Sequence, residues 1–348
     1  MVNLFKMVVH GPADRWSRRR SGRKYGFAYD HVLGTSCDIR IWARSSHAAA
    51  QAQAAILSEV DRLAPILSGW SDISELSVWQ RTYGVDVSVS HDLAEVLELA
   101  ETWRRRTAGA FEPAAPAAGL TVVSGNVEAE GHMDAAPARE QRRLQEPLWE
   151  LDRSREVARR VTHLPMSLDA IAKGYIIDRA VDRARKVPGV RSILLNIGGD
   201  VRHHGQDWAN IGVTNPFAPA DNAPSLAVAT IQSEGLATSG CYRRGVQSGG
   251  RFLSHIVDPW TGESVTRVVS ASVIAPDCTT ADALSTAFSV LTPSQSVALA
   301  DSLLGIACLI VDADGTITTN SRWVDRAIPS GVTANRSSRP TPRNRTDP

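Results

Sequence analysis

The chain has 348 residues, of which 43% are apolar and 22% are charged, and its 38 basic side chains almost balance its 37 acidic ones. This length suits about two domains or one large one. The ordinary numbers of glycine and proline, 25 and 18, exclude collagen-like, coiled-coil and wholly disordered chains, so we expect a soluble globular protein. Every apolar stretch is far shorter than the ~20 residues of a membrane-spanning helix, so we predict no span.

Positive charge gathers at the two ends of the chain. Residues 15–24 include six basic side chains and no acidic one, and residues 330–348 include four arginines and one aspartate. Short ends rich in Arg and Ser are typical of solvated tails, although they would also suit nucleic acid or anionic lipid. Because aromatic residues do not alternate with basic ones along a face, we expect no nucleic-acid partner. We predict a flexible basic leader over 1–28 and a disordered basic tail over 329–348.

The cysteines and the N-terminal sequence indicate the cellular compartment of the protein. The cysteine spacings are long and irregular and contain no C-x-x-C, which predicts free thiols rather than a zinc site or a disulfide framework. The basic start is not followed by the apolar segment of a secretory signal. The sequence as written therefore predicts a cytoplasmic protein without a lipid anchor, and a truncated start would leave export as the alternative.

The first elements are a strand and two helices. We expect a strand over 29–42 interrupted at Gly34, a helix over 47–63, and a second helix for which Asp92 is the N-cap. The apolar residues of the second helix recur at helical spacing and should face the core: Leu93, Val96, Leu97, Ala100 and Trp103.

The middle and end of the chain mix both element types. Residues 113–147 are rich in Ala, Gly and Pro and lack periodicity, which indicates a long connection or a domain seam. We then expect a helix over 168–185 and a buried strand over 191–197. Further strands are predicted over 208–213, 226–233, 270–274 and 306–311, and further helices over 280–291 and 294–304. Since no regular βαβ alternation emerges, we predict an α+β fold, with one catalytic domain over 29–328.

The most informative stretch is LDAIAKGYIID at 168–178, followed after a strand by NIGGD at 196–200. A helix start with small residues and Lys173 would let a phosphate approach free backbone N–H groups at the positive end of the helix dipole. Gly198 and Gly199 would let the backbone approach a ligand without an intervening Cβ, with an aspartate at the rim. The alternatives are an ordinary glycine turn and a solvated lysine.

A second constellation combines TSG at 238–240 with HIVDPWTG at 255–262. His255 stands where an apolar strand end meets a Pro-x-Thr-Gly turn. In that place a histidine can face a cleft and act as an acid, a base or a phosphate donor. The alternative is a histidine satisfied by a carbonyl of the turn.

A third constellation, DCTTADALST at 277–286, contains a candidate cation site. Asp282 and Thr286 are four residues apart, so on a helix their oxygens project from one face. With a backbone carbonyl and phosphate oxygens they would suit Mg²⁺, which takes few protein ligands. The alternative is that Thr279 or Thr280 caps the helix and Asp282 complements its dipole.

Taken together, these motifs resemble the ApbE family of flavin transferases, and the resemblance extends from about residue 29 to residue 312. The family's MGT is similar to LGT at 33–35, and its Ser-x-aromatic and Ser-Glu elements are similar to SGW at 68–70 and SE at 74–75. Its GAFDP is similar to GAFEP at 109–113. Its AKGYxxD, NxGGD, TSG, HIxDPxTG and ADAxxTA motifs occur here almost unchanged.

This resemblance implies a T-fold-like α+β protein with antiparallel or mixed sheets and packed helices, forming a single large two-lobed catalytic unit. It also implies a transferase that takes FAD as substrate, cleaves its pyrophosphate with Mg²⁺, releases AMP and attaches FMN through a phosphoester to a Thr of an acceptor flavoprotein. The implied metal ligands are Asp282, Thr286 and the carbonyl of Ala172. Trp70 would stack on the flavin, and His255 would stand beside the reacting phosphate or accept the proton of the incoming Thr. The other residues implied in FAD binding are Gly34, Thr35, Ser74, Glu75, Lys173, Asp178, Gly198, Gly199, Asp200, Thr238 and Ser239.

The sequence departs from the family pattern at some positions and leaves alternatives open. Asp169 stands where a glycine is typical, Glu112 replaces an aspartate, and Trp260 replaces a basic residue, but no proposed metal ligand is lost. The same site would also suit an FAD pyrophosphatase or a flavin-binding protein without turnover. SGVT at 330–333 loosely resembles an acceptor sequence, which suggests the hypothesis of self-labelling at Thr333.

Overall fold

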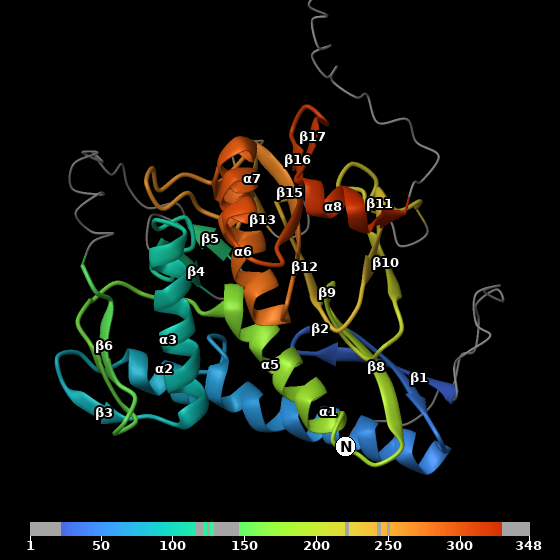
Figure 1. Cartoon of the computed structure of the whole chain (residues 1–348). Coiled ribbons are helices and arrows are strands. Elements are labelled where there is room, and N and C mark those ends of the chain that lie inside the picture. The colour runs from blue at the N-terminus through green and yellow to red at the C-terminus, as the bar shows by residue number, and fades with distance from the viewer. Residues whose placement is uncertain are drawn as a thin grey trace, which may run out of the picture.

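The computed structural model describes residues 22–115, 121–123, 126–128, 146–219, 223–241, 245–248 and 251–328. Within these residues, eight strands form one antiparallel sheet in the order β1-β2-β8-β9-β12-β15-β16-β17 (Figure 1). The strands are β1 (Arg23–Val32), β2 (Thr35–Ala43), β8 (Val190–Ile197), β9 (Asp200–His204), β12 (Gly235–Gly240), β15 (Val268–Ala275), β16 (Ala307–Asp312) and β17 (Ile317–Thr319).

Helices cover one face of this sheet, and a small sheet with a short helix covers the other (Figure 1). The helices are α1 (Ser46–Leu67), α2 (Glu75–Gln80), α3 (His91–Arg106), α5 (Asp169–Ala184), α6 (Cys278–Val290), α7 (Pro293–Ser302) and α8 (Ser321–Arg326). The small sheets are β10 (Ala209–Val213) with β11 (Ala227–Ile231) and β18 (Ala327–Ile328), β3 (Asp86–Ser88) with β7 (Val157–Arg160) and β6 (Trp149–Asp152), β4 (Thr121–Val123) with β5 (Asn126–Glu128), and β13 (Gly245–Ser248) with β14 (Arg251–Ser254).

Strand β16, next to the edge strand β17, is buried on both faces. Cys308 and Ile310 belong to the larger core beneath the helices, whereas Ala307, Leu309 and Val311 belong to the smaller core on the opposite face. Successive side chains of a strand point to opposite faces, so a strand that packs against an apolar core on each side is apolar throughout. This explains the uninterrupted apolar run that predicted the strand.

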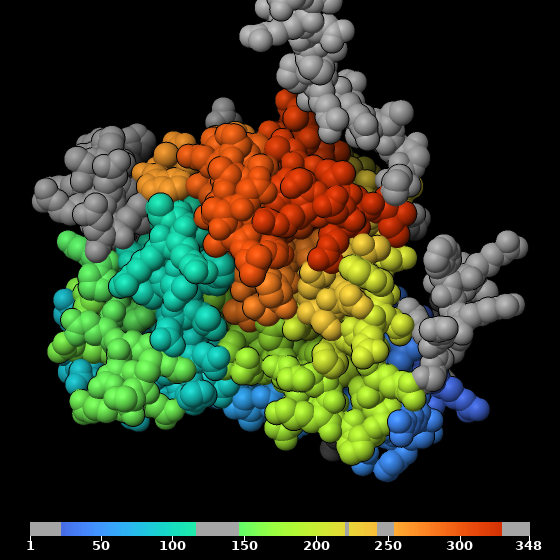
Figure 2. All heavy atoms as spheres, in the orientation of Figure 1, coloured from blue at the N-terminus to red at the C-terminus, as the bar shows by residue number. Residues whose placement is uncertain are grey.

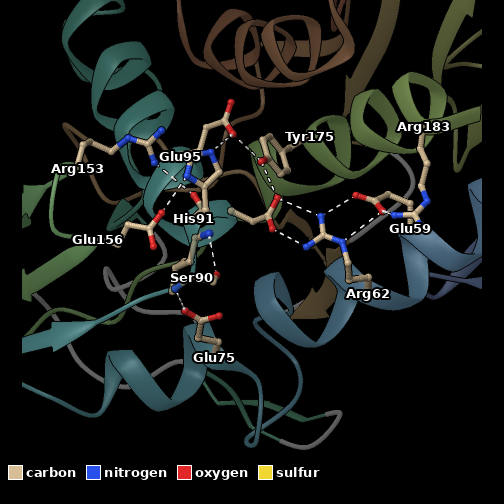
Figure 3. Close-up of polar contacts among 12 residues, drawn as sticks. Glu59, Arg62, Glu75, Ser90, His91, Glu95, Arg153, Glu156, Tyr175 and Arg183 are labelled. Atoms are coloured by element: carbon tan, nitrogen blue, oxygen red, sulfur yellow. Dashed lines mark hydrogen bonds and ion pairs between the residues drawn. The ribbon is translucent and has the colours of Figure 1, made fainter. Parts of the chain in front are cut away.

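An ion-pair network joins α1, α3 and α5 in the helical layer (Figure 3). Arg62 of α1 lies 2.6 Å from both Glu59 and Asp92, and the Tyr175 hydroxyl of α5 lies 2.9 Å from Asp92 and 2.8 Å from Glu95. Hydrogen bonds from Arg62 lower the pKa of Glu59. Burial alone would raise the pKa of Asp92, but the bonds from Arg62 and Tyr175 lower it overall. The network therefore stabilises the packing of three helices with ionised carboxylates.

In Figure 2, α3 in cyan meets the orange segment of α6 and α7 at the surface.

The sheet and the helices confirm the predicted α+β class, and most predicted elements are present. The predicted core face of the second helix is buried throughout. The helix expected over 168–185 is α5, and the strands expected over 191–197 and 306–311 are β8 and β16. The four cysteines are free, as predicted, and all four are buried. Every helix in the described residues is too short or too polar to cross a bilayer.

Three sequence predictions need correction. The strand expected over 29–42 is a hairpin, because Leu33 and Gly34 adopt left-handed φ angles of 51° and 75° and turn the chain back. Residues 23–28 were assigned to the leader, but they pair with β2 as part of β1. Ser90, not Asp92, caps α3, by accepting a hydrogen bond from the backbone N–H of Leu93.

Two predicted segments lie largely or wholly outside the described residues. Most of the expected seam over 113–147 lies outside the described residues. The tail with Thr333 lies wholly outside them.

Candidate active site

Some of the predicted site residues, among them Lys173, Asp282 and Thr286, lie where α5 crosses α6. A Cβ on Gly174 of α5 would lie 2.5 Å from the carbonyl oxygen of Cys278, so only glycine allows the two helices to approach this closely. The backbone N–H of Gly174 donates a 3.0 Å hydrogen bond to Oδ2 of Asp282 on α6. This contact brings the segment with Ala172 and Lys173 beside the helix face that presents Asp282 and Thr286.

Asp282 is an acidic group buried in this crossing, with 5% of its surface exposed. Burial raises its pKa to about 8, Asp200 adds to the increase, and Lys173 opposes it. The ammonium of Lys173 lies 2.7 Å from Oδ2 of Asp200. Burial alone would lower the pKa of Lys173, but the two carboxylates raise it overall, so the lysine is protonated. When all three groups are ionised, one negative charge remains uncompensated among them.

Lys173 was expected to be a phosphate-binding charge or a solvated side chain. Its ammonium is held by Asp200 at the start of β9, with 26% of its side chain exposed. Its positive charge also interacts with the carboxyl group of Asp282. The lysine therefore connects the turn after β8 to the first turns of α5.

A group of hydroxyl side chains lies between β12 and α6. Oγ of Ser239 is 3.2 Å from Oγ1 of Thr286 and 2.8 Å from Oγ of Ser285. On the same strand, Oγ1 of Thr238 lies 2.8 Å from Oγ of Ser272. Ser239 of the TSG motif thus contacts a proposed metal ligand, whereas Thr238 and Ser272 point to the opposite face of the sheet.

Two glycine-containing turns pack together at the other side of the site. Gly198 and Gly199 adopt φ angles of 62° and 99°, which L side chains rarely adopt. A Cβ on Gly198 would lie 2.7 Å from Cγ2 of Thr35, so the turn before β2 closes directly onto the turn after β8. The amide of Asn196 accepts a 3.0 Å hydrogen bond from the N–H of Gly199 and fixes the second turn. The predicted glycine motifs are therefore neighbours.

The residues at the crossing fit a hard divalent cation by their chemistry. Asp282, Thr286 and the carbonyl of Ala172 supply only oxygen donors, which Mg²⁺ prefers. Burial raises the pKa of the Asp282 carboxyl to about 8, and a bound cation would favour its ionised form. Within the described residues, no group of three or more His, Cys, Asp or Glu side chains could hold a metal. A cation in this part of the chain would therefore depend on a mixed set of oxygen donors.

Three residues from the FAD-binding prediction make contacts inside the fold. Ser74 caps α2 by accepting from the N–H of Ser77 at 3.1 Å, and Glu75 accepts a 2.5 Å bond from the N–H of Ser90. Asp178 accepts hydrogen bonds from the first turn of α6. Each of these side chains therefore has a structural contact that the sequence did not predict.

Trp70 and His255 are two exposed side chains of the predicted set. Trp70 is 75% exposed, and the loop that carries it approaches α5, since a Cβ on Gly69 would lie 3.6 Å from a carboxylate oxygen of Asp169. His255 is exposed just after β14. The turn predicted after it is present, with Asp258 accepting a 2.8 Å bond from the N–H of Trp260.

The sequence did not identify the residues that hold the two helices together. Gly174 was noted only as a letter of the AKGY motif. Thr279 or Thr280 was suggested as the cap of α6, but the N-cap is Asp277. A glycine inside an amphipathic helix signals a close approach of another backbone, so Gly174 could have been found. The partner of Asp178 is a hundred residues away in sequence, and no local pattern indicates it.

A comparison with protein families decides the assignment: the model of the ApbE family matches residues 33–310. The chain belongs to the ApbE family. Curated relatives extend over most of its length. The chain is 30% identical over 336 residues to an FAD:protein FMN transferase of Treponema pallidum, covering 87% of this chain and 89% of that protein. It is 27% identical to the protein of the same name from Haemophilus influenzae, covering 86% and 88%.

Solved ApbE structures agree with this membership. The crystal structure of the ApbE protein from Thermotoga maritima superposes with a TM-score of 0.76 at 25% identity, covering 88% of this chain and all of that one. The flavinyl transferase ApbE of Pseudomonas stutzeri shares the fold with a TM-score of 0.71 at 20% identity, covering 88% and 98%.

Proposed function

We propose that this chain is an FAD:protein FMN transferase. In the reaction, the pyrophosphate of FAD is cleaved, AMP leaves, and FMN becomes attached through a phosphoester to a Thr hydroxyl of an acceptor protein. The observation that carries the proposal is the convergence of the AKGY, TSG and ADAxxTA motifs at the α5–α6 crossing, where the buried Asp282 contacts the backbone of Gly174. Membership of the family and the name shared by its curated relatives support it.

We assign Mg²⁺ to this crossing, with Asp282, Thr286 and the carbonyl of Ala172 as its protein ligands. Mg²⁺ would supply positive charge to the pyrophosphate oxygens, which carry increasing negative charge as the bond breaks. The Asp200–Lys173 pair would place a second positive group beside the same phosphates. Without these charges the dianionic linkage would repel an oxygen nucleophile.

The remaining parts of the site would orient the substrate and the acceptor. The paired turns with Thr35 and Gly198 would line the path of the nucleotide, and Trp70 would stack against the flavin ring. His255, exposed beside its turn, would accept the proton of the incoming Thr hydroxyl. Positioning of this kind contributes a large part of the rate in phosphoryl transfer.

The test uses the purified chain with FAD and Mg²⁺, with and without an acceptor domain that contains the Thr. We expect in-gel flavin fluorescence on the acceptor, together with AMP in equal amount. Release of free FMN at the rate of AMP release, without any acceptor, would assign the site to hydrolysis instead. Recovery of unaltered FAD after prolonged incubation would leave a flavin-binding protein and would contradict the proposal.

A further inference from the structure

Asp178 lies in the third turn of α5 and contacts the first turn of α6. Its carboxylate accepts hydrogen bonds from the N–H of Cys278 at 2.9 Å and from the N–H and hydroxyl of Thr279 at 2.8 and 2.6 Å. Nε of Arg202 from β9 lies 3.3 Å from the same carboxylate. The side chain is buried, with 6% of the residue's surface exposed. These contacts occupy both carboxylate oxygens with partners from inside the protein.

Asp178 acts on the same part of α6 as Gly174. The two residues are four apart and so share one face of α5. Gly174 contacts the carbonyl of Cys278, and Asp178 accepts from the N–H groups of Cys278 and Thr279. In return, Asp282 of α6 accepts from the N–H of Gly174. Each helix thus provides a carboxylate that accepts from the backbone of the other.

This reciprocal arrangement bears directly on the proposed metal ligands. Ala172 lies on α5, whereas Asp282 and Thr286 lie one and two turns beyond Cys278 on α6. Any rotation or sliding of α6 against α5 would change the separation between the carbonyl and the two side chains. The bonds of Asp178 oppose both motions, because they fix the beginning of α6 at two successive N–H groups.

We propose that Asp178 is a positioning residue that sets the metal-binding geometry by clamping the start of α6 to α5. This inference rests on the proposed function, since it concerns the same cation site. It assigns to Asp178 an indirect role, in place of the direct contact with FAD that the sequence motif implied. Partners that orient metal ligands typically change metal affinity by about 10–100-fold when they are removed.

The principal variant is Asp178→Asn, with Asp277→Ala as the matched control. An amide keeps the shape but would turn an NH₂ group toward an N–H donor, so at least one bond to α6 is lost. Asp277, the N-cap residue directly before α6, caps the same helix end by accepting a 2.6 Å bond from the N–H of Thr280. Both variants remove a cap of α6, but only Asp178→Asn loosens the link to α5.

The measurement is the binding of Mn²⁺, followed by electron paramagnetic resonance of the free ion, together with the melting temperature of each variant. We expect the dissociation constant for Mn²⁺ to rise about 10-fold or more in Asp178→Asn and less than about 3-fold in Asp277→Ala. In assays, the Mg²⁺ concentration for half-maximal activity should rise in the same variant, while the KM for FAD at saturating Mg²⁺ stays unchanged.

The outcomes separate this inference from the proposed function. Equal Mn²⁺ affinity in Asp178→Asn and the unaltered chain would overturn the clamp and leave the transferase proposal intact. An equal loss in Asp277→Ala would also overturn it, because general fraying of α6 would then be sufficient. If the unaltered chain showed no saturable Mn²⁺ binding, the metal site and the clamp would both be wrong. Should Asp178→Asn fail to fold, Thr279→Ala removes only the hydroxyl bond, and an unchanged affinity in it would count against the clamp.

Discussion

Two acidic clusters in the helical layer are built from similar residues and behave in opposite ways. Around α1 and α3, Glu59 and Asp92 each accept hydrogen bonds from Arg62, and the pKa of both carboxyls is lowered. At the α5–α6 crossing, burial and the neighbouring Asp200 raise the pKa of Asp282 to about 8. In the first cluster Arg62 bonds to both carboxylates, whereas the second has the single ammonium of Lys173 for the carboxyls of Asp200 and Asp282. A structural acidic cluster therefore differs from a candidate cation site in the balance of its charges.

The type of cation explains part of the difference. The guanidinium of Arg62 forms bonds to two carboxylates at once (Figure 3). The ammonium of Lys173 is a compact charge, and it lies 2.7 Å from Asp200, which leaves Asp282 with a backbone N–H as its hydrogen-bond donor. Adding a cation at the second cluster should therefore stabilise the protein more than adding one at the first.

The largest expected effect follows from removing the carboxylate of Asp282. We expect Asp282→Ala to lower the rate of FMN transfer and of AMP release by on the order of 10²–10³-fold, because the proposed cation loses its charged ligand. The variant should also lose saturable Mn²⁺ binding. The check is a paired assay of AMP and acceptor fluorescence at equal protein stability. Undiminished turnover in Asp282→Ala would remove the metal assignment.

Arg62→Gln would disrupt the first cluster without touching the second. We expect the free energy of unfolding at pH 7 to fall by roughly 1–2 kcal/mol, since charged hydrogen bonds are lost at a side chain that is partly exposed. The pKa values of Glu59 and Asp92 are lower in the folded protein than in the unfolded protein, where they lie near 4. The ionised carboxylates therefore stabilise the fold above about pH 4, and this stabilisation is lost as the pH falls through their pKa values in the folded protein. The difference in the free energy of unfolding between Arg62→Gln and the unaltered chain, measured by urea unfolding, should therefore decrease from pH 7 to pH 3.

The same variant also tests how independent the two clusters are. Mn²⁺ affinity should be the same in Arg62→Gln and the unaltered chain. A loss of affinity comparable to that of a ligand variant would show that the clusters act as one unit.

The smallest effect is expected at the surface, from Trp70→Ala. Because Trp70 is 75% exposed, its removal should change the free energy of unfolding by less than about 0.5 kcal/mol. If the indole stacks on the flavin, the KM for FAD should rise about 5–10-fold, as an aromatic stack of about 1–1.5 kcal/mol would give. Trp208→Ala is the matched control, since Trp208 is also exposed, at 51%, but lies outside the proposed site. Equal KM values in both variants would argue against stacking.

The sequence was sufficient to predict the fold class and most of the elements, because apolar periodicity records which face of a helix or strand is buried. The core face of α3 and the apolar run of β16 are examples. The hairpin of β1 and β2 was mistaken for one strand, since the left-handed φ of Leu33 is set by the turn as a whole and not by its residue type. Short strands such as β9 and β12 were missed because their residues are largely polar or small.

For the candidate site, motifs indicated which residues meet but not how each one is used. The convergence of the glycine turns, Lys173 and Asp282 could be expected from their shared resemblance to one family. The pairing of Lys173 with Asp200 and the capping of α6 by Asp178 depend on contacts between distant segments. Charge balance in a buried site is a property of the folded protein, and no local pattern could have supplied it.

The central claim is that a divalent cation binds between α5 and α6, and anomalous scattering from a crystal soaked in Mn²⁺ and FAD tests it most directly. We predict one peak within coordination distance of the Asp282 carboxylate, the Thr286 hydroxyl and the carbonyl of Ala172, next to the FAD pyrophosphate. A peak at the acidic cluster around Arg62 instead, or FAD bound with its pyrophosphate remote from Asp282, would contradict the account.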